Sequence, residues 1–105
     1  MEPRILRCLD PKPADSLPIL REELYRAEAH DFNLIRVDPE VEKPPHPYTA
    51  GDSFMLVLAG RLQLMVDGQS YDLGPGDLAF IPKGAVRGFR TGPEGATFFA
   101  GHLRG

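Results

Sequence analysis

Short apolar runs separated by turn-forming residues dominate the stretch from His46 to Thr91. The runs are Phe54–Leu58, Leu62–Val66, Leu78–Ile81 and Ala85–Phe89, and the separators are Ala59-Gly60, Asp67-Gly68, Gly74-Pro75-Gly76-Asp77 and Pro82-Lys83-Gly84. Runs of this length are typical of strands, and glycine, proline and aspartate between them are typical of tight turns. The pattern predicts a small antiparallel sandwich or barrel, with its clearest hairpin at Asp67-Gly68.

The residues before this stretch predict an approach to the barrel within a single domain. Residues 1–30 are interpreted as a lead-in and edge segment, and residues 31–105 as the barrel. Ser16 and the following Pro18 predict a helical turn and then a strand, although residues 22–29 fit a strand equally well. His30-Asp31 is interpreted as a turn before a strand at Phe32–Val37, where apolar residues alternate.

Prolines and glycines set the remaining boundaries. Val41–Tyr48 contains Pro44, Pro45 and Pro47. Proline cannot donate a hydrogen bond to a sheet, so this segment is predicted to be a loop or an edge strand. Thr91–Gly95 is predicted to be a loop, and Ala96–Ala100 the closing strand.

Composition and charge exclude several classes of partner. The 105 residues carry a formal net charge of −3, and no basic run exceeds two residues, which argues against a nucleic-acid partner or an anionic membrane surface. Cys8 is the single cysteine, so no intramolecular disulfide or cysteine-based metal site can form. Without an apolar run of signal-peptide or membrane-span length, we expect a cytoplasmic protein.

Phe54–Leu58 is apolar at every position, so both faces of this strand need cover. One face is expected to line the barrel interior. The other is expected to pack against a second sheet or against another subunit, and both alternatives fit the sequence.

The turn framework resembles that of the cupin family, whose members are small jelly-roll barrels, also described as double-stranded β-helices. Gly76, then DLAFI, then Pro82-Lys83-Gly84 matches the family's second motif, and Gly60 matches the glycine that ends its first motif. The resemblance extends from about Phe32 to Gly101. It implies an all-β, single-domain barrel, commonly a homodimer, of the kind found in isomerases, oxygenases, decarboxylases, polyketide-pathway proteins and ligand-binding domains.

The resemblance also implies positions for a metal site, which this chain mostly fails to fill. The four positions that bind one divalent ion in the family correspond here to His46, Tyr48, Ser53 and Arg87. His46 keeps its ligand type, and Asp52 is a substitute for the family's glutamate, so a site for zinc, manganese or iron would rest on these two residues. Arg87 cannot ligate, because guanidinium stays protonated. An inward Arg87 would oppose a dication by roughly 8 kcal/mol at 4 Å and an effective dielectric of 20.

The same positions predict a site for a polar or anionic ligand. Arg87 is interpreted as a clamp for a carboxylate or phosphate, the alternative being a salt bridge to Asp52 or a solvent-facing side chain. Tyr48 and Ser53 offer hydroxyls, or else only pack and cap a strand end. Gln63 either lines the cavity or faces water, and His46 either binds a ligand or lies in a loop.

Three hypotheses of different classes follow. The first is a small-molecule-binding barrel that uses His46, Tyr48, Ser53, Gln63 and Arg87, with little or no metal. The second is a metal-dependent enzyme of oxygenase, isomerase or polyketide-pathway type that uses His46 and Asp52. The third is a dimeric interaction module with a plugged barrel. His30 and His102 are interpreted as surface residues in all three.

Overall fold

The computed structural model describes residues 2–105, and within them it contains seven β-strands and no helix. The strands are β1 (Ile19–Arg26), β2 (His30–Val37), β3 (Glu42–Pro47), β4 (Gly51–Val66), β5 (Gln69–Leu73), β6 (Leu78–Ile81) and β7 (Val86–Arg104). Every strand pairing is antiparallel. The all-β prediction is confirmed, and nothing in residues 2–105 forms a helix long and apolar enough to cross a membrane.

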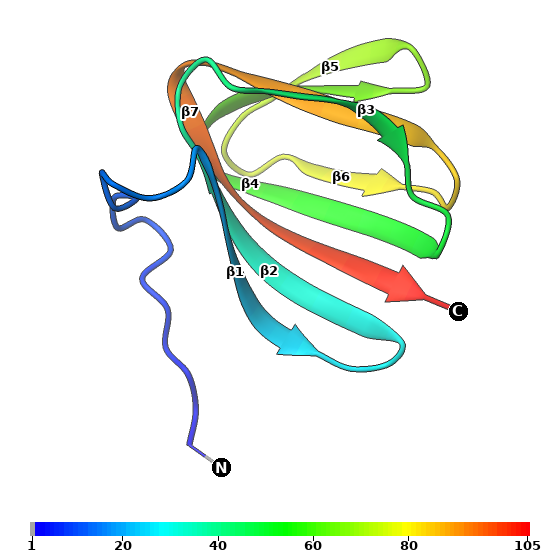
Figure 1. Cartoon of the computed structure of the whole chain (residues 1–105), viewed down its shortest axis with the longest axis horizontal. Coiled ribbons are helices and arrows are strands. Elements are labelled where there is room, and N and C mark those ends of the chain that lie inside the picture. The colour runs from blue at the N-terminus through cyan, green and yellow to red at the C-terminus, as the bar shows by residue number, and fades with distance from the viewer. Residues whose placement is uncertain (1) are drawn as a thin grey trace.

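Two long strands, β4 and β7, divide the structure into two half-sheets (Figure 1). In the first half-sheet, residues 96–104 of β7 lie between β2 and residues 51–60 of β4, with β1 at one edge and β6 at the other. In the second half-sheet, residues 86–91 of β7 lie between β3 and residues 62–66 of β4, and β5 pairs with β4. Each long strand therefore belongs to both walls of the barrel.

The predicted breaks at Ala59-Gly60 and Thr91–Gly95 are wrong as ends of strands, because both lie inside continuous strands. Gly60 pairs with Ala96 and Leu62 with Thr91, so residues 92–95 of β7 are opposite Arg61 alone. A mismatch of this kind bends a strand. Gly60 and Gly95 have φ angles of 74° and 68°, which favour glycine, and the bend redirects each chain from one half-sheet to the other.

The other three of the four turns predicted between the apolar runs are confirmed. Asp67 and Gly68 have φ angles of 49° and 84°, as a two-residue hairpin requires. In the turn after β5, the Asp77 carboxylate accepts a hydrogen bond of 2.8 Å from the Gly74 amide. The Pro82-Lys83-Gly84 turn separates β6 from β7.

The helical turn predicted after Ser16 is wrong. The Ser16 hydroxyl donates a hydrogen bond of 2.6 Å to the Pro13 carbonyl and closes a turn, after which residues 19–26 form β1. Pairing with β2 satisfies the backbone of this segment and overrides its weak helical spacing. His30-Asp31 also belongs to β2 and not to a turn; the chain reverses just before it, where the Ala27 amide donates to the His30 carbonyl.

The proline-rich segment 41–48 contains β3 (Glu42–Pro47), an exposed strand that is paired with β7 alone among the described residues. This is one of the two predicted alternatives for that segment. The hydrophobic core lies between the half-sheets and includes Val57, Leu62, Leu64, Ile81 and Phe98, each at most 3% exposed. Leu64, Ile81 and Phe98 of this core also line a cavity between the half-sheets.

Candidate functional site

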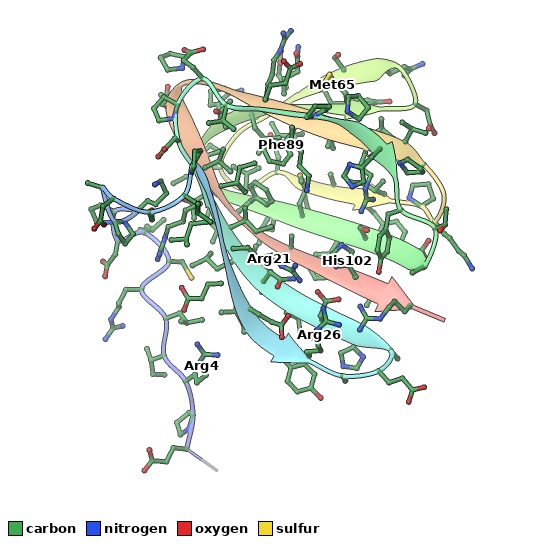
Figure 2. All side chains as sticks on the ribbon, viewed as in Figure 1. Arg4, Arg21, Arg26, Met65, Phe89 and His102 are labelled. Carbon is green, nitrogen blue, oxygen red and sulfur yellow. The ribbon has the colours of Figure 1, made fainter. Side chains whose placement is uncertain are left out.

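A cavity of about 290 Å³ lies between the two half-sheets. Its floor is apolar and includes Met55, Leu64, Ile81, Phe89 and Phe98, whereas its polar side chains come from β1, β2, β3, β4 and β7 and from the segment after β3. Figure 2 shows Arg21 and His102 on the first half-sheet and Phe89 on the second. An apolar pocket with a few polar groups is the usual form of a small-molecule site.

The structure brings four of the predicted ligand residues together around this cavity: His46, Tyr48, Ser53 and Arg87. The strand register explains the grouping, because His46 of β3 lies directly opposite Arg87 of β7. Along β4, Ser53, Met55 and Val57 alternate inward and are all buried. Side chains two apart on a strand share a face, so the buried face of β4 carries Ser53 to the cavity wall.

Gln63 and Asp52 lie outside the cavity. Gln63 lies in a separate outer hollow on the second half-sheet, where its side-chain oxygen accepts a hydrogen bond of 2.7 Å from Arg90 Nε. Asp52 is on the pleat face opposite to that of Ser53, and its carboxylate accepts a hydrogen bond of 2.8 Å from the Lys83 amide. Neither residue shares the site with His46 and Arg87.

Arg87 is a partly buried cation with an unused donor. Its Nη2 donates a hydrogen bond of 3.1 Å to the Ser53 hydroxyl, and its guanidinium carbon lies 5.1 Å from the centre of the Tyr48 ring. Nη1 is buried and has no hydrogen-bond partner among the described residues. Burial lowers the pKa of Arg87, and the nearby Tyr48 opposes that shift. An unpaired buried donor of this kind is costly to the fold.

Positive charge accumulates around Arg87 without acidic residues in the cavity lining. Lys43 lies exposed at the rim, where partial desolvation, and then the positive charges of Arg87 and Arg21, lower its pKa. Arg21 is paired with Asp31 at 3.5 Å and Glu23 at 3.7 Å. No aspartate or glutamate is among the described residues that line the cavity, so Arg87 and Lys43 have no carboxylate partner there.

A second polar group surrounds Asp31, which is fully buried at 0% exposure. Its carboxylate accepts hydrogen bonds of 2.8 Å from Asn33 and about 3.1 Å from His102 Nδ1, and it pairs with Arg104. Burial alone would raise the pKa of Asp31. The hydrogen bonds from Asn33, His102 and Arg104 outweigh burial and hold that pKa well below its ordinary value.

The sequence prediction missed this group because it assigned His30-Asp31 to a turn and His102 to the surface. The interpretation of His102 as a surface residue is wrong: its side chain is 26% exposed and lines the cavity. One signal was available, since the alternation of Phe32–Val37, extended backward, places Asp31 and Asn33 on the same face as Ile35. No local signal linked Asp31 to His102, which is paired with it through the register of β2 and β7.

The donor set does not fit a tightly held divalent ion. No three histidine, cysteine, aspartate or glutamate side chains in residues 2–105 are placed to hold a metal together. His46 is separated from Asp52, and Arg87 places a fixed positive charge opposite His46.

Comparisons with known proteins agree with this architecture. The family model described as a cupin domain matches residues 33–100. A curated uncharacterized protein of Aquifex aeolicus (strain VF5) is 39% identical over 67 residues, which cover 64% of this chain and 55% of that protein. The chain thus spans about half the length of this curated relative.

Solved structures share the fold at low sequence identity. The cupin domain of Cnp3 from Schizosaccharomyces pombe has a TM-score of 0.81 at 15% identity, covering 86% of this chain and 67% of that one. An RmlC-like cupin from Shewanella frigidimarina has a TM-score of 0.77 at 22% identity, covering 84% and 78%. A protein from Thermus thermophilus has a TM-score of 0.81 at 22% identity over the full length of both chains. These folds confirm the jelly-roll prediction. Because the family model matches more than half of the chain, the chain belongs to the cupin domain family.

Proposed function

We propose that this cupin binds a small carboxylate ligand in the barrel, with Arg87 as the clamp and little or no metal. The observation that carries the proposal is the buried Nη1 of Arg87, which has no partner among residues 2–105 in a cavity lining without acidic side chains. A cation that is partly removed from water is stabilised when an anion balances it. A ligand carboxylate would supply both the charge and the missing acceptor.

The groups around Arg87 favour the binding of a planar anion over that of a spherical one. Guanidinium presents paired N–H groups that match the two oxygens of a carboxylate. Ser53 and Tyr48 hold the guanidinium from two sides, so its direction is set before a ligand arrives. Lys43 and His46 at the rim would attract and orient the anion, and the apolar floor would receive its hydrocarbon part. A cavity of about 290 Å³ suits a metabolite-sized ligand.

The two rival hypotheses have weaker support. A metal-dependent enzyme would need His46 and Asp52 in one site, and Asp52 lies outside the cavity with its carboxylate engaged by Lys83. A plugged barrel would need a side chain that fills the interior, whereas Met55 and Phe89 line an open space. Open volume beside an unpaired cation favours ligand binding.

The test is a calorimetric titration with short carboxylates, each compared with the amide of the same shape. We expect carboxylates to bind and amides not to bind. Arg87→Gln is expected to weaken binding by roughly tenfold to a hundredfold, because a hydrogen bond to a charged group contributes about 1.5–3 kcal/mol.

Arg90→Gln is the matched control, since Arg90 lies on the same strand but bonds Gln63 outside the cavity. It is expected to leave binding unchanged. Equal loss in both variants, or equal binding of acids and amides, would contradict the proposal. Stoichiometric metal in chelator-free protein that falls in His46→Ala would favour the metal-dependent alternative.

A further inference from the structure

A bulge in β3 directs two of its side chains toward the same face of the sheet. Lys43 is opposite Phe89 of β7. His46 is opposite Arg87, so three steps along β3 match two steps along β7. In a regular strand, residues three apart point to opposite faces. The extra residue at Pro44-Pro45 removes that difference, and both Lys43 and His46 line the cavity.

The backbone of Gly88 in β7 is in close contact with this bulge. A Cβ atom at Gly88 would lie 2.5 Å from the Lys43 carbonyl oxygen and 2.7 Å from the Pro45 nitrogen. These contacts are too short for any side chain, so only glycine allows β3 to approach β7 at this point. The inward position of Lys43 therefore follows from the way in which the two strands are paired.

Lys43 has no counter-ion among residues 2–105, since none of the salt bridges in that part of the chain includes it. Its surroundings are positive, and desolvation, followed by the charges of Arg87 and Arg21, lowers its pKa. Arg21 differs from Lys43, because Asp31 and Glu23 already balance its charge. Two uncompensated cations, Lys43 and Arg87, thus face one cavity.

A single carboxylate on Arg87 would leave Lys43 without a partner. The two cations also lie at different depths, because Nη1 of Arg87 is buried whereas Lys43 is exposed at the rim. Phe89 lies beside both of them: it is opposite Lys43, it shares a face of β7 with Arg87, and its buried ring lines the cavity. An apolar chain with an anionic group at each end would match this arrangement.

We infer that the ligand of this cavity is a short dicarboxylate, with one carboxylate on Arg87, the other on Lys43 and the hydrocarbon chain against Phe89. This inference rests on the proposed function and adds to it the charge of the ligand and the residue that selects the second charge. Arg87 holds a carboxylate through paired N–H groups, whereas the ammonium of Lys43 is a compact charge on a flexible stem. Lys43 is thus suited to bind the far end of a ligand whose first carboxylate is fixed deeper in the cavity.

The test compares malonate, succinate, glutarate and adipate with their half-amides by calorimetric titration at neutral pH. Each half-amide keeps one carboxylate and replaces the other with a neutral group of the same shape. The wild-type protein is expected to bind at least one diacid about tenfold more tightly than its half-amide. A factor of this size lies between the small gain of an exposed ion pair and the larger gain of a buried one.

Lys43→Gln removes the charge at the rim and keeps a polar side chain. It is expected to reduce the preference for the diacid to less than about threefold and to leave the affinity for the half-amide within about threefold of the wild type. Lys43→Arg keeps the charge and is expected to retain the preference. Lys83→Gln is the matched control, because Lys83 is exposed in the turn before β7 and does not line the cavity. It is expected to bind like the wild type.

The outcomes separate this inference from the proposed function. Equal binding of every diacid and its half-amide by the wild type overturns the inference and leaves Arg87 as the clamp for a monocarboxylate. A preference that persists in Lys43→Gln, or that is lost equally in Lys83→Gln, overturns the role of Lys43. If neither diacids nor half-amides bind, the inference and the proposed function both fail.

Discussion

At the scale of residues, two arginines of β7, Arg87 and Arg104, differ in the partners that they have. The Arg87 guanidinium has one neutral hydroxyl partner, a ring face and an unused buried donor, whereas Arg104, at the end of the same strand, is paired with Asp31 and two backbone carbonyls. An unpaired donor costs the fold free energy that a bound anion would restore. This difference between two arginines on one strand is the main physical support for the binding proposal.

Asp31 is expected to make the protein sensitive to acid. Its pKa is lowered in the fold relative to the unfolded value of about 4. Since the unfolded chain binds the proton more readily, the contribution of Asp31 to stability is complete above that value and is lost as the pH falls below about 4. Urea unfolding at a series of pH values checks this expectation.

Asp31→Asn is the variant for that series. Removing one partner from a buried ion pair costs roughly 3 kcal/mol, so we expect a loss of this size at pH 7 and a smaller difference at pH 3. A constant difference between the two proteins across the series would show that the charge of Asp31 does not contribute.

The candidate site was predictable where it depended on position in a motif. His46, Tyr48, Ser53 and Arg87 were found because they occupy the positions that correspond to the ligand positions of the cupin motifs. Asp31 and His102 were missed because no local pattern links residues that far apart in the chain. Gln63 was ambiguous because strand alternation alone does not say which face of β4 turns inward after the bend at Gly60.

At the scale of elements, the bend that directs β4 and β7 into both half-sheets depends on Gly60. A Cβ atom at this position would lie 2.2 Å from the Gly95 carbonyl oxygen, and the φ angle of 74° is unfavourable for other residues. We expect Gly60→Ala to destabilise the protein by about 3 kcal/mol or more, from strain and a backbone clash together. Chemical denaturation measures the loss.

Gly76→Ala is the control for strain without a clash. Gly76 has a φ angle of 91°, and nothing lies within 4 Å of an added Cβ. Its loss is expected to be about 1 kcal/mol. Similar losses of stability at the two positions would show that the clash with Gly95 adds nothing to the cost of a side chain at Gly60.

The elements that were predicted correctly are those whose sequence signal lies within a few neighbouring residues. Each of the turns at Asp67-Gly68, Pro75-Gly76 and Lys83-Gly84 requires a residue with positive φ, and the glycine that supplies it is visible in the sequence. Gly60 and Gly95 also have positive φ angles, but at these positions the positive φ allows a bend within paired strands. A glycine shows that the backbone turns and does not show whether pairing continues beyond it.

At the scale of the whole molecule, the outer face of the first half-sheet exposes apolar side chains beside an open edge. Leu78 and Phe80 of β6 are 65% and 62% exposed, and β6 pairs only with β4. Phe80 lies opposite Phe54, which packs with Phe99 at 5.7 Å and Phe32 at 6.1 Å. Apolar surface of this kind commonly marks an interface, and we propose that two copies of the chain associate through it as a homodimer.

Phe80→Lys is expected to convert a dimer to a monomer, because burying a lysine without a partner opposes association. Light scattering coupled to size-exclusion chromatography measures the mass. Val86→Lys, which adds a charge at another exposed position, is expected to leave the mass unchanged. A wild-type protein that is monomeric at high concentration would contradict the proposal.

The position of β7 between its neighbours in both half-sheets has a consequence for how the molecule folds. β7 pairs with β2, β3 and β4, and it carries both Arg87 and His102. Structures that depend on pairings between distant segments fold slowly, because the chain must close large loops before those contacts form. Until β7 is in place, β2 and β3 are not paired with the rest of the barrel and neither wall of the cavity is complete. If the binding proposal holds, capture of an anion would be a late event in refolding and would report that the last long-range pairing has formed.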